Sequence, residues 1–173
     1  ETGLGLHPSM LKMQEMYLDG KMGVVQGVGY PNQDRSHFRS TDIWTSGSEA
    51  TEYLNTGWLG RYFYDGHADY PEGYPNADYD APFALTMGSL VSETCQGPLT
   101  NFSLALEDPF SLAPLSEGEI GNLPDNNYGH ELRFLIDAIA QTNAYSGVIL
   151  EAANGGSNQI TYPANNRLAT QLK

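Results

Sequence analysis

Cysteine and basic residues are scarce in this chain of 173 residues, which contains one cysteine, Cys95. A single thiol excludes an internal disulfide and a metal site built on paired cysteines. Lysine and arginine number 8 against 21 aspartates and glutamates, a formal net charge of −13. A surface this acidic repels phosphate backbones, so we expect no nucleic-acid partner. No apolar run approaches the roughly 20 residues that a membrane-spanning helix needs, so we expect no such segment.

Both ends of the chain lack features of a complete domain. The first residues contain no initiator methionine, no basic region and no apolar stretch of a signal peptide. At the other end, Leu168 and Leu172 keep a helical spacing, and no glycine or asparagine stop follows. We therefore expect residues 1–173 to be a single partial domain, with N- and C-terminal parts of the full domain absent. A complete small domain with frayed ends is the alternative.

The apolar pattern predicts an α/β fold. Residues 10–19 carry apolar side chains at helical spacing and are followed by Gly20, a typical helix stop. Residues 22–28 are rich in valine and nearly continuously apolar, which is typical of a strand buried on both faces. A helix, a glycine turn and a buried strand together favour α/β layering. Further helices are expected at 36–44, from Thr56 as N-cap and over about 128–155, and further strands at 83–87 and 102–106.

A dense group of polar side chains follows the strand predicted at residues 22–28. In α/β sheets, ligands collect beyond the carboxyl ends of strands, and a helix N-terminus stabilises an anion or a nucleophilic oxygen. In that setting Ser36 would be a nucleophile, His37 a proton donor or acceptor and Arg39 an anion clamp. The same pattern also describes an N-capping serine, a surface imidazole and a solvated arginine, and spacing alone favours this plainer interpretation.

Several blocks of the sequence carry a family resemblance. They are Leu6-His7-Pro8, residues 23–31, residues 35–40, Trp44, residues 56–61 and residues 160–163. Together they resemble the bacterial family called domain of unknown function 1501, whose members are usually exported and are grouped with the alkaline phosphatase and sulfatase superfamily. The resemblance implies an exported protein, periplasmic or extracellular, with a three-layer α/β fold and a mostly parallel sheet, of which this chain supplies part.

The resemblance implies one of two functions. The first is a metal-dependent hydrolase of phosphate or sulfate esters, in which Ser36 is the nucleophile or a metal ligand while His37 and Arg39 hold the anion. The superfamily's metal ligands come from segments near both ends of the full protein. We therefore expect the ligands of a divalent metal to lie mostly outside this chain, in the rest of the polypeptide or in a partner chain, and the chain alone to be inactive.

The second function is a non-catalytic exported protein, binding or structural, that uses the same fold and makes contacts through tyrosine- and acid-rich loops. Sulfatases run from a helix through a glycine turn and a strand to a nucleophile at the start of the next helix, followed by an arginine, and residues 10–47 are similar in order and spacing. Two departures weaken this parallel. The sulfatase proline is absent after the predicted nucleophile, and Arg39 stands one position early.

Residues 65–82 are predicted to form a long loop rich in tyrosine and aspartate. Its length exceeds the about 12–15 residues of ordinary structureless connections, which suggests a functional excursion. Its spacing is not that of an EF-hand, so solvated carboxylates are the favoured interpretation and a calcium site is the alternative. The residues of that calcium site would be Asp65, Asp69, Asp78 and Asp80. The tyrosines of this region form either a stacking platform for sugars or a partner, or an anchor for their own loop.

Three expectations concern single residues. Cys95 has no histidine nearby in the sequence, so we expect a buried free thiol. Trp44 and Trp58 have large apolar areas, so we expect both to be mostly buried, near residues 22–28. Asn101 begins an Asn-Phe-Ser triplet that matches the glycosylation pattern, which is common by chance.

Overall fold

The computed structural model describes residues 3, 5–33, 35–112, 122–157 and 159–171. The chain divides into two compact units, residues 1–34 and 35–173. Its structure is α/β, with 42% helix and a small parallel sheet, so the predicted fold class is confirmed at that level. No helix in the described ranges is both long and apolar enough to span a membrane.

The first unit contains helix α1, Leu11–Leu18, which confirms the helix predicted at residues 10–19. Gly20 follows with φ 69°, a left-handed conformation that glycine adopts without strain. The strand predicted at residues 22–28 is wrong, because these residues, all described, are neither helix nor strand. Within this segment Gly27 has φ 68°, outside the range of a strand, and Val25 is 81% exposed. Without a neighbouring strand to share hydrogen bonds, an apolar run cannot form a sheet.

The second unit begins with helix α2, His37–Ser46, which confirms the helix predicted at residues 36–44. Ser36 is its N-cap, and Gly47, with φ 67°, ends it. Both signals are local, which is why the sequence pattern was sufficient to place this helix.

Helix α3, Trp58–Gly66, begins one residue later than predicted. Its N-cap is Gly57 and not Thr56. A Cβ atom at position 57 would lie 2.1 Å from the carbonyl oxygen of Thr94, so this close approach admits only glycine. Thr56 instead accepts a hydrogen bond through Oγ1 from Arg61 Nη1, at 3.2 Å.

The sheet consists of β1, Ala84–Met87, and β2, Ser103–Leu106, which pair in parallel from Ala84↔Ser103 to Met87↔Leu106. Both strands match the predicted segments. Two short 3-10 helices are η1, Glu93–Cys95, and η2, Pro109–Ser111. The longest helix, α4, Asn127–Gly155, matches the long helix predicted over about 128–155, and α5 is Arg167–Gln171.

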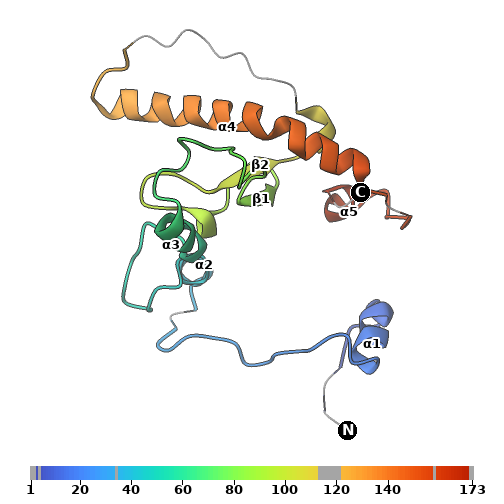
Figure 1. The fold of residues 1–173 in the computed structure, drawn as a ribbon. Coiled ribbons are helices and arrows are strands. Elements are labelled where there is room, and N and C mark those ends of the chain that lie inside the picture. The colour runs from blue at the N-terminus through green and yellow to red at the C-terminus, as the bar shows by residue number, and fades with distance from the viewer. Residues whose placement is uncertain (1–2, 4, 34, 113–121, 158, 172–173) are drawn as a thin grey trace. The chain divides into compact units, whose positions relative to one another are not determined.

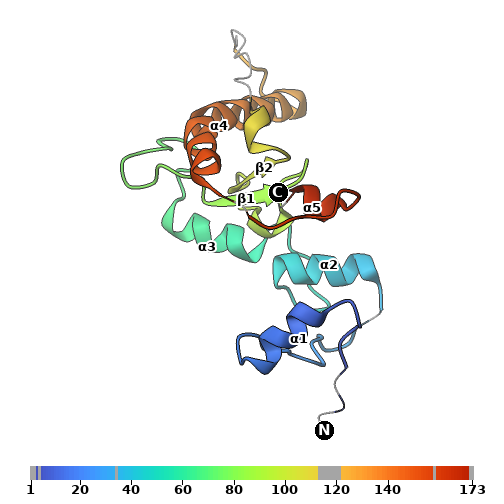
Figure 2. The same ribbon diagram turned by 90° about the vertical axis from the view of Figure 1, so that its right-hand side faces the viewer.

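Helices lie on both sides of the two-stranded sheet (Figure 1, Figure 2). Helix α4 runs along one side, and α3 lies on the other. On the α4 side, Leu106 of β2 packs with Tyr145 and Ile149. On the α3 side, Phe63 packs against a cluster that includes the fully buried Phe102.

The expectation that both tryptophans are mostly buried is wrong. Trp44 is 73% exposed and Trp58 is 48% exposed. Helix α2 buries the face that carries Ile43, so the next residue along the helix points away from that face. In α3, Leu59 and Phe63 face the core, and the neighbouring positions, Trp58 included, remain accessible.

Many large apolar side chains of the described chain are exposed, as expected where further segments or a partner chain cover the surface. They occur in both units. Examples are Leu11, Leu18, Val25, Val28, Phe38, Trp44, Leu90, Leu99, Phe110 and Leu168.

Candidate functional site

The Ser36 region lies at the start of α2, as predicted. Ser36 Oγ accepts a hydrogen bond from the backbone N–H of Arg39 at 3.2 Å, which is the N-cap geometry. His37 is the first helical residue, and its side chain is exposed. A serine and an accessible imidazole therefore stand together at a helix N-terminus.

Arg39 does not present its guanidinium to solvent for an anion. The residue is 7% exposed. Its Nη2 donates to the carbonyl oxygen of Glu49 at 2.9 Å, to that of Ala50 at 3.1 Å, and to that of Glu52. Its Nε donates to the Ala50 oxygen at 3.3 Å, and the guanidinium carbon lies 4.0 Å from the ring centroid of Tyr53. In this structure Arg39 fastens the segment after α2, in place of the anion clamp that we expected.

A cavity of about 430 Å³ lies near α2 but does not include the predicted site. On α2 it is lined by Asp42, Thr45 and Ser46. Neither Ser36 nor His37 contributes to its wall. The structure thus brings Ser36 and His37 together without placing them in this cavity.

The four aspartates predicted as calcium ligands do not gather into a metal site. Asp65, Asp69, Asp78 and Asp80 are all exposed. Among the described residues, no group of three or more histidine, cysteine, aspartate or glutamate side chains could hold a metal ion.

The tyrosines of the loop anchor it to the core, one of the two alternatives left open by the sequence. Tyr70 stacks on Phe102, with ring centroids 4.8 Å apart. Tyr74 and Tyr79 pack against Phe83, at 5.5 and 5.6 Å. The Tyr74 hydroxyl also lies 2.8 Å from His67 Nδ1. The loop is therefore held in one place by its own aromatic side chains.

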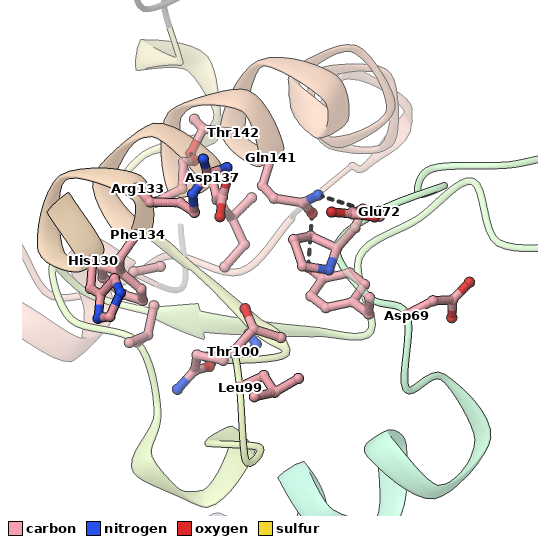
Figure 3. Close-up of a pocket in the computed structure, with 18 of the residues that line it drawn as sticks. Asp69, Glu72, Leu99, Thr100, His130, Arg133, Phe134, Asp137, Gln141 and Thr142 are labelled. Atoms are coloured by element: carbon pink, nitrogen blue, oxygen red, sulfur yellow. Dashed lines mark hydrogen bonds between the residues drawn. The ribbon is translucent and has the colours of Figure 1, made fainter. Parts of the chain in front are cut away.

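A larger cavity, of about 810 Å³, lies between this loop and α4 (Figure 3). We call it the α4 cleft. Its walls are residues 68–72 of the loop, residues 99–101 and 103–105 together with position 91, and one face of α4 between positions 130 and 142. All of these residues belong to the second unit.

Two hydrogen bonds fasten α4 to the loop at the wall of the cleft. The Tyr70 hydroxyl donates to Gln141 Oε1 at 2.8 Å, and Gln141 Nε2 donates to the carbonyl oxygen of Pro71 at 3.3 Å. Burial raises the pKa of Tyr70, and the nearby Tyr145 raises it further. The phenol therefore remains a hydrogen-bond donor at neutral pH, and the amide of Gln141 is held in a fixed orientation.

The charged side chains of the cleft influence one another. Burial raises the pKa of Asp137, Arg133 lowers it, and Glu72 raises it. The lining has three carboxylates, because Asp69 joins Glu72 and Asp137, against one guanidinium. His130, at the start of the lining face of α4, has its Nε2 3.2 Å from Asp125 Oδ1.

The sequence interpretation missed the polar face of α4. Arg133, Asp137 and Gln141 follow one another at intervals of four residues, which places them on one side of a helix. That stripe was visible in the sequence. Its partners were not, because Tyr70 and Pro71 lie about 70 positions earlier in the chain.

Two single-residue expectations are settled by burial. Cys95 is a buried free thiol, as predicted, and burial raises its pKa against the opposing hydrogen bonds of Ser103 and Ser92. Asn101 is also buried, with Nδ2 donating to the Ser92 carbonyl at 2.9 Å and Oδ1 accepting from Ser103 Oγ at 2.7 Å. The amide of the glycosylation triplet is therefore engaged inside the fold.

No protein-family model, no curated protein and no solved structure matches this chain.

Proposed function

We propose that this chain is part of an exported bacterial protein, periplasmic or extracellular, that resembles the domain of unknown function 1501 family. In this proposal its sheet belongs to the three-layer fold of the alkaline phosphatase and sulfatase superfamily, and its function is to bind a ligand in the α4 cleft. The placement of helices on both sides of a parallel pair of strands supports the fold.

The α4 cleft is the observation that carries the binding function. Its volume, about 810 Å³, lies within the range of about 300–1,000 Å³ of small-molecule sites. Polar groups such as Arg133, Asp137 and Gln141 stand among aromatic and aliphatic side chains in its lining. The bonds from Tyr70 to Gln141 and from Gln141 to Pro71 hold its walls together, so a ligand meets a site that is already formed.

The experiment is to block the cleft by bulk. A panel of small amines, carboxylates, polyols and aromatic compounds is screened against the intact polypeptide by ligand-observed NMR. Ala138 lines the cleft and is exposed, so Ala138→Trp fills it without disturbing the core. Ala140 is exposed on the same helix outside the lining, which makes Ala140→Trp the matched control.

We expect at least one compound to bind both the wild type and Ala140→Trp and not to bind Ala138→Trp. Equal binding by both variants, or no binding by any compound of the panel, contradicts a ligand-binding function of this cleft. Far-ultraviolet circular dichroism verifies that both variants fold.

A second candidate function, the metal-dependent hydrolysis of phosphate or sulfate esters, is favoured by the position of Ser36 and His37 at the N-terminus of α2. In this proposal Ser36 is the nucleophile or a metal ligand and His37 transfers a proton. The metal ligands come from other segments of the polypeptide or from a partner chain. Arg39 takes no part as an anion clamp in this proposal, because Nε and Nη2 are directed to backbone carbonyls and Nη1 lies 4.0 Å from Asp42 Oδ2.

The hydrolase proposal is tested with p-nitrophenyl phosphate and p-nitrophenyl sulfate. Turnover by the intact polypeptide that falls at least a hundredfold in Ser36→Ala, but not in the exposed control Trp44→Ala, supports it. Absence of turnover with added divalent metals, or equal turnover in Ser36→Ala, contradicts it.

A further inference from the structure

We propose that the α4 cleft binds a carbohydrate, a neutral or amino sugar unit, through the polar stripe Arg133, Asp137 and Gln141 and the apolar side chain of Phe134. This inference rests on the proposed ligand-binding function of the cleft and names the class of its ligand.

The charge of the lining disfavours anionic ligands. Asp69, Glu72 and Asp137 outnumber the single guanidinium of Arg133. A phosphate or sulfate group in the cleft would lie near Glu72 and Asp137, and like charges at close range are repelled. The cleft is therefore unsuited to the esters considered for the Ser36 region.

The polar stripe matches the hydrogen-bonding pattern of neighbouring hydroxyl groups. Each sugar hydroxyl both donates and accepts, so adjacent hydroxyls need acceptors and donors in alternation. The carboxylate of Asp137 accepts, the guanidinium of Arg133 donates, and the amide of Gln141 does both. These three follow one another along successive turns of α4 and line the same wall (Figure 3).

The orientation of the amide is fixed before any ligand arrives. Gln141 is bonded through Oε1 to the Tyr70 hydroxyl and through Nε2 to the Pro71 carbonyl. Each of its two polar atoms has further hydrogen-bonding capacity, because a carbonyl oxygen accepts twice and an amide nitrogen donates twice. A fixed amide loses little side-chain entropy on binding, which favours the small polar surfaces that sugars present.

An apolar surface completes the site. Phe134 lines the cleft and is 47% exposed, and Leu99 lines it from the opposite segment of chain. A pyranose ring has faces made of C–H groups, which pack against an aromatic ring or an aliphatic side chain. Figure 3 shows Phe134 beside His130 at one end of the cleft and Glu72 at the other.

A simple cation is a poorer match than a sugar. Asp137, the more buried carboxylate, already interacts with the guanidinium of Arg133. A simple cation bound there would be repelled by that guanidinium and would bring no hydroxyl groups for Arg133 and Gln141, which an amino sugar does bring. The test below therefore includes a polyamine as a cationic probe.

The test uses isothermal titration and ligand-observed NMR on the intact polypeptide. The probes are glucose, glucosamine, N-acetylglucosamine and their β-1,4-linked tetramers, with inorganic phosphate, inorganic sulfate and spermidine as the other arms. We expect at least one saccharide to bind and to lose at least tenfold in affinity in Gln141→Ala and in Phe134→Ala. Leu135→Ala removes a neighbouring exposed side chain that does not line the cleft, and its affinity should equal that of the wild type.

The isosteric variant Asp137→Asn is used if an alanine variant does not fold. It should also lower the affinity for the saccharide at least threefold. Binding of spermidine, phosphate or sulfate with no saccharide overturns the carbohydrate inference and leaves the binding function standing. Saccharide binding that survives Ala138→Trp places the site elsewhere and overturns the inference. Failure of every probe, together with a negative result in the compound panel, overturns the binding function as well.

Discussion

At the scale of single residues, the buried guanidinium of Arg39 shows how one side chain organises a segment that has no regular structure. It donates to the carbonyls of Glu49, Ala50 and Glu52 and lies over the ring of Tyr53. Three carbonyls of a segment outside any helix or sheet thus accept hydrogen bonds from one guanidinium, and the Glu49 carbonyl also accepts from the backbone N–H of Glu52. An ammonium group cannot reproduce this contact, because it lacks the planar fork of the guanidinium.

Replacement of Arg39 should therefore lower stability more than replacement of an exposed arginine. We expect Arg39→Ala to reduce the free energy of unfolding by about 3 kcal/mol, and Arg39→Lys by about 2 kcal/mol, because hydrogen bonds from a charged donor and the packing of a buried side chain are lost. Urea unfolding measures both, with Arg167→Ala on an exposed arginine as the control. Unchanged stability in Arg39→Ala would show that this residue does not support the fold.

The raised pKa of Asp137 predicts how the stability of the fold depends on pH. Its pKa is raised by burial and by Glu72, with Arg133 opposing. An acid whose pKa is higher in the folded state stabilises the fold below its unfolded-state pKa, and this contribution is lost as pH rises through the folded-state value. Asp137→Asn removes this dependence. The variant should thus be more stable than the wild type at about pH 7, and the difference should shrink towards about pH 4.

Unfolding in urea at the two pH values provides the measurement. Glu131→Gln, an exposed neighbour on α4, should show no such pH-dependent gain. A stability difference that stays constant with pH, or a loss at neutral pH, means that the carboxylate is not disfavoured by its surroundings.

At the scale of helices and strands, local signals were sufficient where an element is held by its own neighbours. Ser36 and Gly47 flank α2, and an alternating or periodic apolar pattern marks β1, β2 and α4. The strand expected at residues 22–28 failed because a strand is defined by its partners. An apolar run indicates only that burial of its side chains is favourable. The described part of the first unit contains no strand that could pair with it.

The same distinction holds for the candidate sites. The N-cap role of Ser36 depends on a residue three positions away, so the sequence could predict it. The burial of Arg39 depends on contacts with a segment 10 or more positions away. The hydrogen bond between Tyr70 and Gln141 joins residues 71 positions apart. No local pattern carries that information, so the spacing around Ser36 could not predict that the guanidinium of Arg39 is buried.

Helix α3 offers a matched pair of glycines for a test of packing. A Cβ atom at Gly60 would lie 2.2 Å from the backbone of Gln96, whereas one at Gly66 would meet nothing within 4 Å. Gly60→Ala should therefore push α3 away from the segment around η1 and lower the free energy of unfolding by about 3 kcal/mol. Gly66→Ala should change stability by less than about 1 kcal/mol, in the stabilising direction.

Thermal and urea unfolding of both variants distinguish a packing effect from a helix-propensity effect. If helix propensity alone governed these positions, both alanine variants would be stabilised. Equal behaviour of Gly60→Ala and Gly66→Ala would contradict the close contact between α3 and Gln96.

At the scale of the whole molecule, the two-stranded sheet and the exposed apolar side chains both indicate that further chain packs against this one. Parallel sheets are normally buried on both faces and average about five or six strands, whereas the described sheet has two. Val25, Phe38 and Leu90 are among the large side chains left accessible. Further segments of the same polypeptide, or a partner chain, are the natural cover for such surface.

Residues 1–173 on their own should therefore self-associate or remain loosely packed. Exposed apolar surface binds the dye ANS and favours association, since burying that surface is the main source of stability that the chain lacks. Sedimentation velocity and ANS fluorescence of the isolated chain are the measurements, with the longer polypeptide as the control. We expect dye binding and oligomers in the isolated chain and neither in the longer protein. A monodisperse 18.9 kDa monomer with a cooperative thermal transition would contradict this and would favour a self-sufficient binding module.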